Sequence, residues 1–105
     1  MSSRVRPPAA AGRFYPGDPF ALADAVDALL DVAGTPDTAP PRALVVPHAG
    51  YDYSGPVAAT GFASLRGRAD EVGRVAVLGP AHFVPLTGTA IPAADAWETQ
   101  GKKDV

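Results

Sequence analysis

The chain has 105 residues, of which 47% are hydrophobic and 19% charged, with a formal net charge of −2 and no cysteine. This length allows one domain, close to the lower size at which a single core offsets chain entropy, and the lack of cysteine excludes disulfides, thiolate nucleophiles and cysteine metal sites. The arginines are scattered, and no apolar stretch approaches the roughly 18 to 20 residues that span a bilayer. We therefore expect a cytoplasmic protein that binds neither nucleic acid nor membrane.

The first third of the chain predicts an extended arm followed by a helix. Residues 1–17 show no hydrophobic period, and the stretch RPPAAAGRFYPG is typical of an arm that closes in a turn. Asp18 is a preferred N-cap, and Pro19 fits the first helical position because its missing N–H costs nothing there. Apolar residues then recur at helical spacing up to Gly34, which predicts an amphipathic helix over residues 19–33. These apolar residues are Leu22, Val26, Leu29, Leu30 and Ala33.

Two short β-branched segments flank a second predicted helix. Residues 42–47 (RALVVP) and 73–80 (GRVAVLGP) lack alternation, which is typical of strands covered on both faces. Between them, residues 54–56 (SGP) indicate a helix start and Gly67 indicates its end. Residues 88–94 are a third strand candidate, weakened by a proline. The order strand, helix, strand predicts a right-handed βαβ unit with a parallel strand pair, and hence an α/β fold.

The two histidines of the chain follow these predicted strands in the same way. His48 comes directly after ALVVP and His82 after VAVLGPA, each with a proline shortly before it and an aromatic residue after it. Ligands of parallel α/β sheets bind outside the carboxyl ends of the strands, and neighbouring strands lie ~4.8 Å apart. A metal ion at ~2.0 to 2.2 Å from each ring nitrogen fits between such imidazoles. We predict a shared ion; the alternative is that each histidine is an ordinary loop residue hydrogen-bonded to the backbone.

Two ligands do not complete a metal site, since metal centres generally use three protein ligands. Three carboxylates are candidates for the third ligand. Asp52 is one, although an aspartate at such a position is more often a solvated turn residue. Asp95 and Glu98 are the others, but no sequence feature brings them near the histidines. We interpret Ser54 as a helix cap rather than a nucleophile, because no G-x-S-x-G elbow surrounds it. The remaining candidate ligands are the phenols of Tyr15, Tyr51 and Tyr53.

Several aromatic residues have two interpretations. They either form the wall of a ligand pocket or pack the N-terminal arm over the sheet. They are Phe14, Tyr15, Tyr51, Tyr53 and Phe83.

Four motifs resemble one known family. AGRFYPGDP, VVPHAGYDYSGPVAA, VLGPAHFVPLTG and ADAWET occur in the order and spacing of the Memo-like family, also called AmmeMemoRadiSam system protein B, over nearly all of residues 6–99. That family resembles class III extradiol dioxygenases in fold. The resemblance implies a three-layer α/β domain, with a parallel or mixed sheet and flanking helices, of which residues 1–99 are the N-terminal part.

The resemblance also implies a site. His48 and His82 would be two ligands of an iron or copper ion, with Phe14 and Tyr53 lining the pocket. Radical SAM and AMMECR-type proteins are the implied partners. Residues 79–83 read GPAHF where the family has GPSHH, so a hydroxyl and a second imidazole that could support the metal are missing.

The family pattern continues beyond WET, and the remaining ligand, cysteine or histidine in Memo-like members and a carboxylate in the dioxygenases, lies in that later part. Residues 100–105 (QGKKDV) are instead a polar tail, which fits a truncated or frame-shifted product or a genuine short paralogue. We expect a fragment of a non-haem metal-binding, redox or dioxygenase-like protein that is inactive by itself. The alternative is a non-catalytic adaptor module that binds a peptide or an anion.

Overall fold

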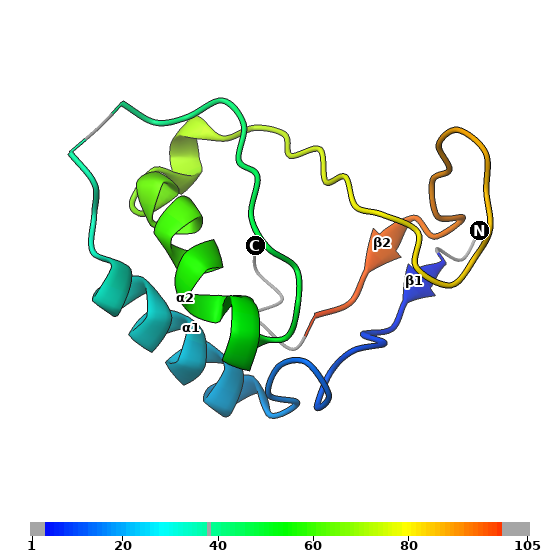
Figure 1. The fold of residues 1–105 in the computed structure, drawn as a ribbon, viewed down its shortest axis with the longest axis horizontal. Coiled ribbons are helices and arrows are strands. Elements are labelled where there is room, and N and C mark those ends of the chain that lie inside the picture. Colours follow the sequence, from blue (N-terminus) through cyan, green and yellow to red (C-terminus); the bar gives the residue numbers. More distant parts are fainter. Residues whose placement is uncertain (1–3, 38, 100–105) are drawn as a thin grey trace.

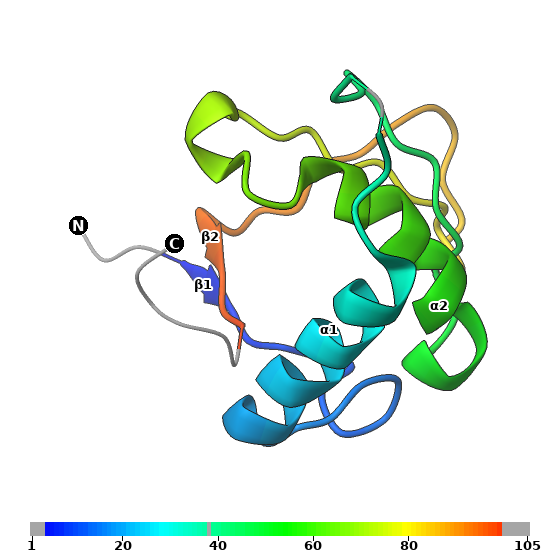
Figure 2. The same cartoon turned by 90° about the vertical axis from the view of Figure 1, so that its left-hand side faces the viewer.

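The computed structural model describes residues 4–37 and 39–99. Helices α1 and α2 lie side by side, and the two short strands lie apart from them on another side of the molecule (Figures 1 and 2). The described chain is thus a small α/β piece, and it contains no helix long and apolar enough to cross a membrane. In chain order the elements are β1 (Val5–Arg6), α1 (Pro19–Ala33), α2 (Tyr51–Phe62), the 3-10 helices η1 (Ala63–Leu65) and η2 (Ala69–Glu71), and β2 (Ala96–Trp97).

Helix α1 has the bounds that the sequence predicts. The Asp18 carboxylate accepts a hydrogen bond from the backbone N–H of Ala21 at 2.9 Å, which satisfies one of the free donors of the first turn. At the other end, Gly34 has a φ of 70° and its N–H donates to the carbonyl of Leu30. The prediction of a capped helix over residues 19–33 is confirmed.

Helix α2 begins earlier than residues 54–56 indicate. Gly50 is its N-cap and offers no side-chain acceptor, so the N–H of Tyr51 donates instead to the carbonyl of Phe14 at 2.8 Å. Ser54 is the fourth helical residue, and its interpretation as the cap is wrong. Pro56 lies inside the helix, where it has no N–H to donate to the carbonyl four residues earlier. Pro56 is exposed, so water can reach this part of the helix.

Small residues of α2 form the contact with α1. The predicted apolar stripe of α1 is half-buried, whereas its aspartates are exposed. The side chain of Leu29 packs on Gly55, where an added Cβ would lie 3.1 Å from the Leu29 Cδ1 atom. Ala59 and Ala63 are buried, but no large side chain is fully buried in the described part of the chain. The core is therefore small. At the surface, an ion pair of 2.7 Å between Asp31 and Arg66 connects α1 to the residue after η1.

The three predicted strands are absent from the described residues. Residues 42–47, 73–80 and 88–94 make no backbone-to-backbone hydrogen bonds there. The prediction of a βαβ unit is therefore wrong for this chain by itself, because a strand requires a hydrogen-bonded neighbour. The sheet that does form pairs β1 with β2 in parallel, with Val5 opposite Ala96 and Arg6 opposite Trp97.

We call residues 42–47 and 73–80 the valine segments. Four of their large apolar side chains are strongly exposed, although their composition is that of buried strands, and Leu44 and Val46 are half-buried. In Figure 1 the second segment runs as an open trace from the helical part of the molecule towards the side where the strands lie. The exposed side chains are Val45, Val75, Val77 and Leu78. The polar tail expected at residues 100–105 lies outside the described residues.

Candidate metal and ligand site

His48 and His82 lie against each other. Their Nε2 atoms are 3.1 Å apart, and the ring centroids are 5.2 Å apart with the ring planes inclined by 36°. Both residues are exposed. The structure thus brings together the two side chains that the sequence analysis paired, although they are 34 residues apart and no strand pairing joins their segments. Their role as metal ligands stays a prediction.

Two arrangements fit a distance of 3.1 Å between imidazole nitrogens. Two neutral rings can form one hydrogen bond in which one Nε2 donates and the other accepts. Two nitrogens bound to one ion at ~2.0 to 2.2 Å, with ordinary angles at the metal, also lie roughly 2.8 to 3.6 Å apart. The pair is therefore spaced for one shared proton or one shared ion.

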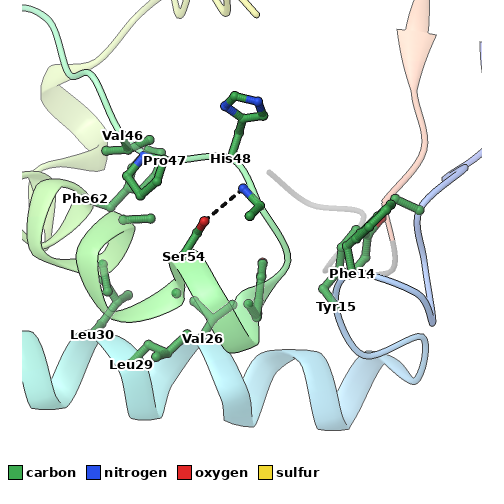
Figure 3. A pocket seen from close by; sticks show the side chains of 16 residues that line it. Phe14, Tyr15, Val26, Leu29, Leu30, Val46, Pro47, His48, Ser54 and Phe62 are labelled. Carbon is green, nitrogen blue, oxygen red and sulfur yellow. Dashed lines mark hydrogen bonds between the residues drawn. The ribbon is translucent and has the colours of Figure 1, made fainter. Parts of the chain in front are cut away.

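A hydrogen bond holds the loop that carries His48. The hydroxyl of Ser54 accepts from the backbone N–H of Ala49 at 2.9 Å, and Ser54 is only 6% exposed (Figure 3). The bond links the residue after His48 to the buried face of α2. In Figure 3 the imidazole points away from the helices, at the rim of the site. Ser54 therefore positions the loop that carries His48.

An apolar hollow lies beneath this loop, between α1 and α2. Its volume is about 580 Å³, and Phe14, His48 and Tyr51 are among the residues that line it. Figure 3 shows His48 at its rim. Tyr53 does not line the hollow, and its side chain is 86% exposed. Ligand binding by any of these aromatic residues remains a prediction. The apolar lining comes mainly from Val26, Leu29, Leu30, Val46, Ala58, Ala59 and Phe62.

The N-terminal arm closes one side of the hollow. Besides the bond between the Phe14 carbonyl and the Tyr51 N–H, the rings of Tyr15 and Tyr51 pack with centroids 5.8 Å apart. Gly50 allows the approach, since a Cβ there would lie 3.2 Å from the Phe14 carbonyl oxygen. Burial, and to a lesser extent the neighbouring Tyr15, raises the pKa of the Tyr51 phenol.

The carboxylates considered as third ligands lie in two places. Asp52 is exposed in the first turn of α2. Asp95 accepts a hydrogen bond from the Arg4 N–H at 2.9 Å, and the Glu98 N–H donates to the carbonyl of Arg6, so both belong to the β1–β2 pairing. Within residues 4–37 and 39–99, no three histidine, aspartate or glutamate side chains come close enough to hold one ion together.

Sequence reasoning missed two contacts of the site. The first is the Ser54 bond to Ala49, because a serine before Gly-Pro is typical of a cap. The second is the Phe14 carbonyl that caps α2, for which the sequence contains no signal. The helical period predicted that Leu29 and Leu30 lie on the inner face of their helix, but it did not predict the hollow that they line.

Comparison with known proteins decides the family. The sequence profile of the family described as "Memo-like protein" matches residues 6–101. The chain belongs to the Memo-like family. The match includes both histidines, the Ser54 helix and the N-terminal arm, so the geometry above is that of a Memo-like sequence.

Relatives within the Memo-like family come from distant organisms. A "MEMO1 family protein" of Aquifex aeolicus is 38% identical over 96 residues, covering 91% of this chain and 34% of the relative. The "Protein memo-1 homolog" of Caenorhabditis elegans is 40% identical over 89 residues, covering 85% and 25%. "Protein MEMO1" of Xenopus tropicalis is 35% identical over 101 residues, covering 94% and 33%.

The chain spans about a third of the length of the relatives it matches. No solved structure gives a significant match to it.

Proposed function

We propose that His48 and His82 are two ligands of a non-haem metal site in a Memo-like protein. The observation that carries the proposal is the 3.1 Å between their Nε2 atoms, which suits two nitrogens on one ion. Imidazole is a good ligand for iron and copper among the transition metals. Iron or copper is the ion we propose, because the family resembles dioxygenases that use such metals.

The two imidazoles would hold the ion and leave the rest of its coordination sphere open. When bound, such an ion supplies Lewis-acid or redox chemistry. This chain contributes the nitrogen donors, the Ser54 hydrogen bond that fixes the His48 loop, and an apolar hollow with His48 in its lining. Because the described residues offer no third side-chain ligand beside the histidines, we propose weak metal binding and no turnover for the 105-residue chain.

The redox or dioxygenase-like activity belongs, in this proposal, to a complete Memo-like domain. Such a domain would have three layers, with a parallel or mixed sheet between helices, and this chain would supply its N-terminal part. The coverage of about a third of each relative supports a role as a portion of that domain. Radical SAM and AMMECR-type partners would likewise act on the complete domain.

A non-catalytic adaptor function is the second candidate, favoured by the apolar hollow. Its volume of about 580 Å³ falls in the range of small-molecule and peptide-anchor pockets. His48 at its rim, with His82 beside it, would then donate hydrogen bonds to a peptide or an anion. Binding of this kind persists in a metal chelator, which separates the two functions.

Anaerobic titration with Fe(II) and with copper, followed by calorimetry, tests the metal proposal. We expect about one ion per chain, with binding lost in both His48→Ala and His82→Ala. Asp24→Ala is the matched control, because it removes an exposed potential ligand on the outer face of α1. No binding by a folded chain, or equal loss in the control, would contradict the proposal and favour the adaptor function.

A further inference from the structure

Tyr15 and Tyr51 come from distant parts of the chain and pack against each other. Their ring centroids are 5.8 Å apart and the ring planes are inclined by 35°, which is within the range of packed aromatic pairs. Tyr15 lies in the N-terminal arm, and Tyr51 is the first residue of α2. Both residues are half-buried, so the pair joins the arm to the helix at a place that remains open to solvent.

Backbone hydrogen bonds hold both tyrosines in place. The N–H of Tyr51 donates to the carbonyl of Phe14, the residue before Tyr15, at 2.8 Å. The Tyr15 carbonyl accepts from the N–H of Gly12, also at 2.8 Å, within a turn that the φ of 80° at Gly12 allows. The approach of the two rings therefore follows from the path of the backbone, and does not depend on the side chains alone.

The hydroxyl ends of the two rings also lie within range of each other. Burial is the main cause of the raised pKa of the Tyr51 phenol, and the neighbouring Tyr15 adds to it because two phenolates there would repel each other. Phenols that lose one electron and one proton couple through the ring carbon beside the oxygen. The atoms that would join are thus next to the ends of the rings that interact.

The third tyrosine of the chain lies in a different setting. Tyr53 is 86% exposed, and within residues 4–37 and 39–99 its ring packs on neither of the other two tyrosines. The chain contains no cysteine, so it has no thiol to compete with its phenols for an oxidant. The packed pair is therefore the place where two oxidised phenols meet.

We propose that Tyr15 and Tyr51 form an oxidative cross-linking site, at which a carbon–carbon bond between the rings ties the N-terminal arm to α2. The oxidant is hydrogen peroxide acting through a haem peroxidase. Each phenol gives up one electron and one proton, and the two phenoxyl radicals join at the carbons beside their oxygens. The hydrogens on the joined carbons then move to the oxygens, which restores both phenols. The electrons and protons removed reduce one peroxide to two waters.

The cross-link makes one wall of the apolar hollow permanent. Tyr15 and Tyr51 both line the hollow between α1 and α2, and the arm closes it on that side. A covalent bond between two distant residues also limits the conformations of the unfolded chain, as a disulfide does. The cross-linked chain should therefore unfold at a higher temperature than the untreated chain.

Oxidation of the dilute, folded 105-residue chain by a haem peroxidase and hydrogen peroxide tests the proposal. A metal chelator is present, so the outcome does not depend on the metal site proposed above. We expect dityrosine fluorescence in a monomeric product that is lighter by two hydrogens. Trypsin cleaves after Arg13, Arg42 and Arg66. Digestion should therefore release residues 14–42 joined to residues 43–66, with fragmentation placing the bond between the two tyrosines of the pair.

Three phenylalanine variants identify the phenols that react. Tyr15→Phe and Tyr51→Phe each remove one phenol but keep a ring that can pack, so the cross-link should be lost in both. Tyr53→Phe is the matched control, because it removes a phenol from the same tryptic peptide as Tyr51. The cross-link should form in Tyr53→Phe as it does in the wild-type chain.

The proposal is wrong if the folded chain gives no intramolecular dityrosine, or if Tyr15 joins Tyr53 as often as it joins Tyr51. It is also wrong if the same bond forms in equal yield in urea, because the fold would then not select the pair. The linked residues are identified in the wild-type chain, so the result does not depend on the folding of any variant.

Discussion

The buried hydroxyl of Ser54 accepts a hydrogen bond from the backbone N–H of Ala49, directly after His48. Ser54→Ala removes the acceptor, so we expect the His48 loop to loosen. Stability should fall by about 1 kcal/mol, the usual net value of such a bond. The affinity for Fe(II) or copper should fall several-fold without being lost, because both imidazoles remain.

Ser64→Ala is the control for this prediction. The Ser64 hydroxyl donates to the carbonyl of Gly61 and is part-buried, but it is remote in sequence from the histidines. Calorimetric titration and urea denaturation should show a stability loss in both variants and an affinity loss only in Ser54→Ala. An unchanged affinity in Ser54→Ala would mean that this bond does not position His48.

The Asp18 cap gives a second prediction. Asp18→Ala removes the acceptor for the Ala21 N–H, and we expect the free energy of unfolding to fall by about 1 kcal/mol. Asp18→Asn retains a capping side chain and should retain most of the stability. Urea unfolding followed by far-UV circular dichroism measures both variants. Equal losses in the two would show that the charge, rather than the hydrogen bond, stabilises the helix.

A third prediction tests the contact between α2 and residues 42–47, where Gly61 meets Val46. Gly61→Ala places a Cβ 2.8 Å from the Val46 Cγ1 atom. The valine side chain is branched at Cβ and has few allowed rotamers, so it cannot easily move away. Better helix propensity favours alanine by about 1 kcal/mol, but overpacking costs about 1 to 3 kcal/mol. We expect a net loss of about 1 kcal/mol in thermal or urea denaturation.

The double variant Gly61→Ala with Val46→Ala tests the cause of that loss. Removing the Val46 methyls makes room for the new Cβ, so the double variant should be more stable than the sum of the two single changes predicts. Strict additivity would show that the two residues are not in contact.

Tyr51 predicts a dependence of stability on pH. Burial raises the pKa of its phenol, so the folded chain holds this proton more tightly than the unfolded chain, whose tyrosines titrate near pH ~10. The associated stability is fully present below that pH and is lost as the pH rises through the raised pKa of the folded state. Tyr51→Phe should therefore flatten the decline in stability as the pH rises above ~10.

Tyr53→Phe serves as the comparison for Tyr51, because its side chain is 86% exposed. Chemical denaturation across the alkaline range should show the wild-type decline in Tyr53→Phe and a shallower one in Tyr51→Phe. Identical declines in all three proteins would place the alkaline titration elsewhere in the chain.

Local signals predicted the parts of the structure that local interactions determine. Helix α1 follows from Asp18, Pro19, Gly34 and the apolar period, all of which act within a few residues. The start of α2 did not follow, because the carbonyl of Phe14 caps it from a distant segment. The two-residue strands β1 and β2 are too short to leave a periodic pattern, and their partners are far apart in sequence.

The site shows the same division between local and distant causes. Equivalent positions after two β-branched segments predicted that His48 and His82 would meet, and their rings are in contact. The strands used in that argument are nevertheless absent from the described chain. A β-branched, apolar composition favours a strand only where neighbouring strands and covering side chains are present, and composition alone does not show whether they are.

The pairing of β1 with β2 also affects the order in which the chain folds. Arg4 and Asp95, which meet there, are 91 residues apart, so closing this contact fixes almost the whole polypeptide as one loop. The α1–α2 hairpin requires a much shorter closure, and contacts of low sequence separation form faster. We expect the helical hairpin to form first and the strand pair to close last. Substitutions at Trp97 should then change the unfolding rate far more than the folding rate.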